Sequence, residues 1–146
     1  MTSVDFYILP DNKLQEKFAC VLAEKARKQD LKVYIYTESR EKALRLDDLL
    51  WTYKDISFLP HNLADGDSDD KTCIIIGWNG TTITPFELLI NLTMGVPTFA
   101  NKFDRIMEIV EANEPARKQA RNRYRQYREL EFELRSHDLE ASHAAI

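Results

Sequence analysis

Six basic side chains and no acidic one occupy residues 115–128: Arg117, Lys118, Arg121, Arg123, Arg125 and Arg128. At 3.6 residues per turn, spacings of four, three, one and three place five residues on one side of a helix: Arg117, Arg121, Tyr124, Arg125 and Arg128, with Lys118 beside them. Guanidinium groups hold carboxylates through paired hydrogen bonds, and an adjacent ring can receive an apolar side chain. This face therefore suits a short acidic peptide that has an aromatic residue and a terminal carboxylate.

Two other interpretations of the same basic stretch stay open. Arginine and tyrosine also neutralise phosphates and stack on bases, so the helix at 115–130 is a candidate for direct binding of single-stranded nucleic acid. A basic helix face can also simply be solvated. Between Pro115 and Arg128 no glutamate stands at i+4 spacing to relieve the mutual repulsion of the arginines, which weakens the solvated interpretation.

A second group of residues suited to binding lies between residues 51 and 63. Large side chains surround a turn-rich connection there, as is typical of interface anchors: Trp51, Tyr53, Phe58, Leu59, Pro60 and Leu63. The alternative is that these side chains cap the hydrophobic core. His61, beside a proline, indicates by itself neither a ligand nor a catalyst.

No pattern of residues indicates catalysis, and we expect no catalytic residue, no cofactor and no metal. The loop after the first predicted strand, residues 10–13, has no glycine, so neither the dinucleotide fingerprint nor the Walker loop is present. His61, His137 and His143 lack the spacing of zinc ligands. The aspartates of residues 65–70 lack the spaced ligands of a calcium loop, and we interpret them as a solvated acidic loop.

The elements that must position these residues alternate between strand and helix patterns. Short apolar runs predict strands at 4–9, 31–36, 73–77 and 88–92, and amphipathic periodicity predicts helices at 14–29 and 39–51. Residues 105–110 suit an interior strand, although they also fit a helical face. Asn113 as a cap and Pro115 in the first turn predict a long helix that ends near Leu130. This alternation predicts an α/β fold in three layers, a mostly parallel sheet flanked by helices, with a Rossmann-like topology but no nucleotide-binding loop.

Length and composition limit the organisation of the chain. Its 146 residues are 44% hydrophobic, which is enough apolar material for one core, and we expect a single domain over 1–136 and a flexible segment at 137–146. A net charge of −4 does not require a nucleic-acid partner. Cys20 and Cys73 lie in apolar runs and are expected to be free, buried thiols. Without a signal-peptide pattern or a bilayer-spanning run, the sequence predicts a cytoplasmic protein.

Four segments, in order and spread over nearly the whole chain, resemble the chi subunit of bacterial DNA polymerase III. They are VDFYIL at 4–9, ALRLDDLLW at 43–51, SFLPHNL at 57–63 and ARNRYRQYR at 120–128. The third is the most specific of them. The resemblance implies an α/β fold without a nucleotide site and a non-catalytic part in DNA replication.

The resemblance also implies partners and the residues that contact them. In that family, chi links the clamp loader, through the psi subunit, to the acidic C-terminal tail of single-stranded-DNA-binding protein. Carried over to this sequence, the tail site uses Arg117 or Lys118, Arg121, Tyr124 and Arg125, with Arg128 on the same face. The psi contact uses Trp51, Phe58, Pro60, His61 and Leu63. Arg125 stands where the family has a lysine, which keeps the positive charge.

Overall fold

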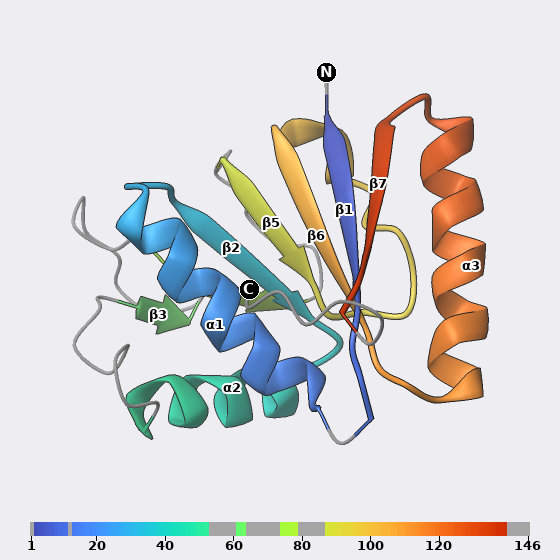
Figure 1. Ribbon diagram of the computed structural model, residues 1–146. Helices are drawn as coiled ribbons and strands as arrows, with labels where there is room; N and C mark the ends of the chain where they lie inside the picture. Colours follow the sequence, from blue (N-terminus) through green and yellow to red (C-terminus); the bar gives the residue numbers. More distant parts are fainter. Residues whose placement is uncertain (1, 12, 53–60, 64–73, 79–86, 140–146) are drawn as a thin grey trace.

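A seven-stranded sheet runs through the computed structural model, which describes residues 2–11, 13–52, 61–63, 74–78 and 87–139 (Figure 1). The elements in chain order are β1 (Ser3–Ile8), α1 (Gln15–Lys28), β2 (Val33–Thr37), α2 (Arg40–Thr52), β3 (His61–Leu63), β4 (Ile74–Trp78), β5 (Leu88–Asn91), η1 (Ala100–Lys102), β6 (Arg105–Val110), α3 (Glu114–Glu129) and β7 (Glu133–Asp138). The strand order is β3-β4-β2-β5-β6-β1-β7, and every described pairing is parallel. Parallel neighbours need crossover connections, which α1, α2 and α3 supply. The predicted α/β fold is confirmed.

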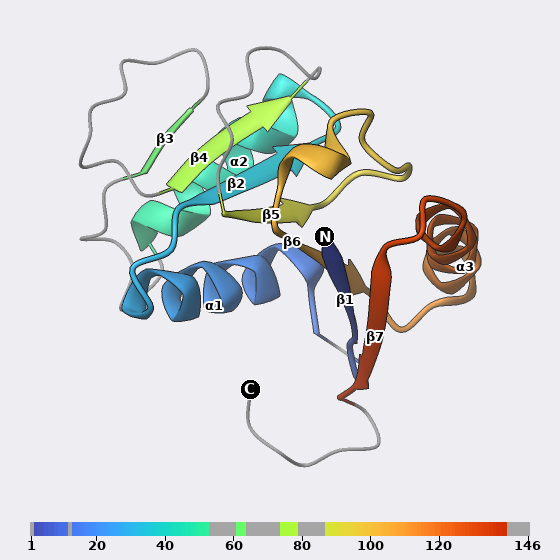
Figure 2. The same ribbon diagram turned by 90° about the horizontal axis from the view of Figure 1, so that it is seen from above.

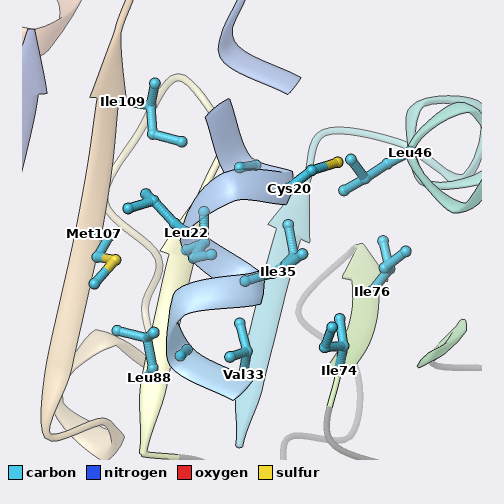
Figure 3. Packing of buried hydrophobic residues seen from close by; sticks show 14 of the residues in the cluster. Cys20, Leu22, Val33, Ile35, Leu46, Ile74, Ile76, Leu88, Met107 and Ile109 are labelled. Atoms are coloured by element: carbon cyan, nitrogen blue, oxygen red, sulfur yellow. The ribbon is translucent and has the colours of Figure 1, made fainter. Parts of the chain in front are cut away.

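Helices cover both faces of the sheet, as Figure 2 shows from above. On one face α1 and α2 enclose a core whose members include Cys20, Leu22, Leu46, Ile35 and Ile76 (Figure 3). On the other face α3 and η1 pack over Val4, Phe6, Leu89 and Ile106. Burying each such side chain stabilises the fold by roughly 1.5–3 kcal/mol, so this two-sided core fixes where α3 lies on the sheet.

Residues 105–110, whose pattern fits both a strand and a helical face, form strand β6. The strand pairs on both sides, so that Ile106 lies opposite Leu89 of β5 and Val4 of β1. Five of its six residues are buried. A strand that is covered on both faces has a nearly continuous apolar sequence and lacks the alternation typical of a half-buried strand. The sequence of β6 therefore also fits the apolar face of a helix.

Strand β7 was not predicted, and it moves the boundary of the expected flexible segment. His137 and Asp138 belong to β7, where they pair with Tyr7 and Ile8 of β1. The prediction that residues 137–146 form a flexible segment is therefore wrong for these two, and residues 140–146 lie outside the described part. The strand sequence ELRSHD has a single apolar residue, so hydrophobic periodicity had no signal to detect.

The helix that precedes β7 begins and ends where the sequence predicts. The Asn113 side chain accepts a hydrogen bond from the Ala116 backbone N–H at 2.8 Å, and Pro115 lies in the first turn. The chain leaves the helix at Leu130, and Glu131 then takes a positive φ of 64°. This short turn returns the chain to the sheet edge, so that α3 and β7 lie side by side (Figures 1 and 2).

Candidate functional site

A cavity of about 300 Å³ lies between α3 and the sheet. Three strands and the helix line it: Phe6 and Ile8 of β1, Val110 of β6, Ser136 and Asp138 of β7, and Arg117, Ala120, Arg121 and Tyr124 of α3. We call this the α3 cavity. Phe6, Val110 and Ala120 are buried, so its floor is apolar, whereas exposed Arg121 places charge at the rim.

Side-chain size and strand register leave this space open. The parallel register of β1 and β7 sets Phe6 opposite Ser136 and Ile8 opposite Asp138. Ser136 is small, and Ala120 on the helix above is small as well, so neither fills the gap. Tyr124 also lines the cavity, with its ring 5.4 Å from that of Phe6. The result is a pocket at the low end of the volumes of roughly 300–1,000 Å³ found for ligand sites, which suits a single side chain.

The structure brings three of the six predicted α3 residues to the cavity, namely Arg117, Arg121 and Tyr124. Lys118, Arg125 and Arg128 are exposed on the same helix but do not line it. The predicted lack of an acidic neighbour is partly offset from outside the basic stretch, because Arg121 Nη2 lies 3.1 Å from Glu114 Oε1. Both side chains are more than half exposed, at 61% and 76%, so this ion pair is weak and a ligand carboxylate can compete for Arg121.

Arg123, the remaining arginine of the basic stretch, points into the protein. Its Nε donates to Glu108 Oε1 at 2.8 Å, and the two side chains are 5% and 0% exposed. The other carboxylate oxygen of Glu108 accepts hydrogen bonds from Tyr127 at 2.6 Å and Asn91 at 2.7 Å. Burial raises the pKa of Glu108 while the Arg123 charge opposes that rise, and burial also raises the pKa of Tyr127. Helical spacing is the one signal for this role, since it places Arg123 on the same side of α3 as Ala120 and Tyr127, and all three are buried.

A second charged cluster lies on the opposite face of β1. Asp5, whose side chain is 1% exposed, is approached by Arg105 Nε at 2.9 Å, Arg135 Nε at 3.0 Å and His137 Nε2 at 2.9 Å. Burial raises the pKa of Asp5, but hydrogen bonds from His137 and Arg105 and the charges of the arginines outweigh it, so that the pKa lies below its ordinary value of 3.8. The ring of His137 also stacks on Tyr7 at 4.9 Å. These contacts attach β7 to the sheet.

Related folds bind a phosphate at the start of the helix that corresponds to α1. In this protein the Glu111 side chain occupies that position. The backbone N–H of Gln15 donates to Glu111 Oε2 at 2.8 Å. A helix N-terminus favours an anion, and the Glu111 carboxylate meets that preference from within the chain. Within the described residues no group of three or more histidine, cysteine, aspartate or glutamate side chains is arranged to hold a metal ion.

Cys20 is free and buried, as predicted, whereas Cys73 lies outside the described residues. Burial raises the pKa of the Cys20 thiol to about 12, so at neutral pH it stays protonated and unreactive. In the part of the chain that the structure describes, no helix has the length and apolar character needed to cross a bilayer.

Three of the five residues predicted to contact psi lie on α2 and on β3, the strand at the other edge of the sheet. Trp51 belongs to the last turn of α2, and His61 and Leu63 belong to β3, which follows the turn-rich connection. Phe58 and Pro60 lie outside the described residues. Strand β3 is one edge of the sheet and β7 the other (Figure 2), and six strand spacings of about 4.8 Å put roughly 29 Å between them.

Comparison with known proteins matches almost the whole chain to one protein family. The sequence model of the family described as DNA polymerase III chi subunit, HolC, matches residues 1–135. The chain is 36% identical over 141 residues to the DNA polymerase III subunit chi of Pseudomonas aeruginosa, which covers 95% of this chain and 98% of that protein. It is 36% identical over 129 residues to the subunit of that name from Haemophilus influenzae, covering 86% and 90% of the two chains. For Escherichia coli the identity is 28% over 141 residues, covering 92% and 96%.

Proposed function

Because the chain belongs to the DNA polymerase III chi subunit family, we propose that it is a non-catalytic adaptor with two partners. The α3 cavity receives the acidic C-terminal tail of single-stranded-DNA-binding protein. The region around Trp51 and β3 receives the psi subunit, which connects the protein to the clamp loader.

The composition of the α3 cavity is the observation that supports the tail site. An apolar floor of Phe6, Val110 and Ala120 lies beside the guanidinium groups of Arg117 and Arg121. A C-terminal phenylalanine has the same two parts, a ring and a carboxylate on one residue. The ring fills the cavity over Tyr124 and the carboxylate pairs with an arginine fork.

The basic residues outside the cavity act on the rest of the tail. Lys118, Arg125 and Arg128 are exposed along α3 and attract the acidic residues that precede the terminal one. Exposed ion pairs are individually weak and screened by salt, so tail binding is of modest affinity and falls as the ionic strength rises.

The separation of the two surfaces supports a linking role. The α3 cavity opens beside β7 and the psi region beside β3, at opposite edges of one sheet. A gap of roughly 29 Å between the edges lets both partners bind at once without contact between them. A rigid parallel sheet then holds the partners at a fixed distance.

Titration with a fluorescent acidic peptide that ends in phenylalanine tests the tail site. Anisotropy is measured at low and at moderate salt for the wild type, Arg121→Ala and Tyr124→Ala. Arg27→Ala on α1, whose side chain is 43% exposed, is the matched loss of one positive charge. We expect binding that weakens with salt and by about tenfold in both α3 variants, but not in Arg27→Ala. Absence of peptide binding, together with tight binding of single-stranded DNA, would replace this proposal with direct nucleic-acid binding by residues 115–130.

Copurification with psi tests the second surface. We expect Trp51→Ala to lose psi while its affinity for the tail peptide stays at the wild-type value, because the two surfaces are far apart. Retained tail binding also serves as the control for folding. A variant that still binds psi with unchanged affinity removes Trp51 from the proposed contact.

A further inference from the structure

Strand β7 gives the α3 cavity a wall unlike the helix wall. Three side chains of β7 lie on the side of the sheet that faces α3, namely Leu134, Ser136 and Asp138. They pair in turn with Val4, Phe6 and Ile8 of β1. This row changes from apolar to small to acidic along the strand. Asp138 thus lines the same cavity as Arg117 and Arg121, and it is an exposed residue.

The Asp138 carboxylate repels any ligand that brings only negative groups to its end of the α3 cavity. The backbone of a nucleic acid presents phosphate oxygens, which accept hydrogen bonds and repel Asp138. A peptide also brings backbone N–H groups, and these can donate to the Asp138 carboxylate and offset the repulsion from the peptide's own charges.

From this arrangement we infer that Asp138 is a specificity-determining residue, which makes the α3 cavity select the end of a peptide over a single-stranded nucleic acid. The inference rests on the proposed tail site. The arginines of α3 attract both kinds of ligand, and Asp138 on β7 makes the site prefer the peptide. A basic helix in a replication protein is thereby kept from the DNA that its partner coats.

The test compares two probes on three proteins at low ionic strength. The probes are the acidic, phenylalanine-ended peptide and an oligothymidylate of similar length, and the proteins are the wild type, Asp138→Asn and Asp30→Asn. Asp30 makes an exposed ion pair with Arg27 at the end of α1, so Asp30→Asn removes the same charge from a distant surface. Its positive φ of 59° is one that asparagine readily adopts.

We expect Asp138→Asn to strengthen oligothymidylate binding by about threefold or more and to change peptide binding by less than twofold, which lowers the selectivity for peptide. Asp30→Asn should leave the selectivity at the wild-type value. Equal shifts for the two probes, or no shift for oligothymidylate, would overturn the role of Asp138 while leaving the tail site intact. A wild type that binds no peptide would instead overturn the tail site, and this inference with it.

Discussion

Arg123 donates through Nε to Glu108 Oε1 at 2.8 Å, and both side chains are almost wholly enclosed between α3 and the sheet. Arg123 also donates to the backbone oxygen of Met94 at 3.2 Å. The next residue along the helix is Tyr124, which lines the α3 cavity. Since consecutive helix residues point about 100° apart, the buried pair fixes the rotation of α3 and so sets how Tyr124 and Arg121 face the cavity.

Replacement of Glu108 by leucine should therefore be costly. It leaves the buried guanidinium of Arg123 without its counter-charge, and we expect a loss of roughly 3–5 kcal/mol in the free energy of unfolding, measured by urea titration. The double variant Glu108→Leu with Arg123→Leu should recover part of this loss, because no unpaired charge remains. A single variant that loses under about 1 kcal/mol would show that the pair does not hold α3.

Filling the α3 cavity should strongly weaken peptide binding without a change of charge. Ser136→Leu places a branched side chain opposite Phe6 and occupies the space meant for the ligand's ring. We expect at least a tenfold loss of affinity in the anisotropy titration and little change in stability, since Ser136 is exposed. Ser136→Ala removes the hydroxyl but keeps the space, so it is the control and should bind within about twofold of the wild type. Undiminished binding by Ser136→Leu would place the ligand elsewhere.

Gly77 on β4 should tolerate no side chain. A Cβ at this position would overlap the Tyr34 ring, which lies on the neighbouring strand β2. We expect Gly77→Ala to lower the free energy of unfolding by about 1–3 kcal/mol through this overlap. Gly95→Ala meets nothing within 4 Å and should change stability by less than about 0.5 kcal/mol. Similar urea midpoints for the two variants would contradict this account.

The contribution of Asp5 to the free energy of unfolding should decrease at low pH. Its pKa is lowered in the folded protein, so its contribution is fully present above the ordinary value of 3.8 and is lost as the pH falls through the folded value. We expect Asp5→Asn to cost roughly 1–3 kcal/mol at pH 7 and the gap from the wild type to narrow below about pH 4. Urea unfolding across this range measures the gap. A gap that stays constant down to pH 3 would mean that the Asp5 charge does not matter.

Most of the fold could be predicted because its signals are local. The cap at Asn113, the proline that follows and the apolar runs of the central strands each act within a few residues, and the structure confirms them. Residues 105–110 remained ambiguous because a strand buried on both faces has no alternation. Its partners β5 and β1 settle the conformation, and they come from distant parts of the sequence.

The candidate site was predictable only on its helix side. Arg117, Arg121 and Tyr124 share a helical face, which spacing alone reveals. Ser136 and Asp138 enter the cavity through the register between β7 and β1, and no local pattern encodes a pairing of residues more than 100 positions apart. Strand β7 is also polar at an exposed edge, where hydrophobic periodicity fades and where polar residues discourage pairing with other chains.

The Glu111 carboxylate at the start of α1 has a consequence for the protein inside a growing cell. Proteins that leave this helix end to a bound phosphate become more stable as the ligand accumulates, because the ligand binds only the folded state. Here the anion is covalently part of the chain, so its local concentration is constant. The contribution of this helix end to the free energy of unfolding therefore does not depend on the concentration of any phosphate metabolite in the cell.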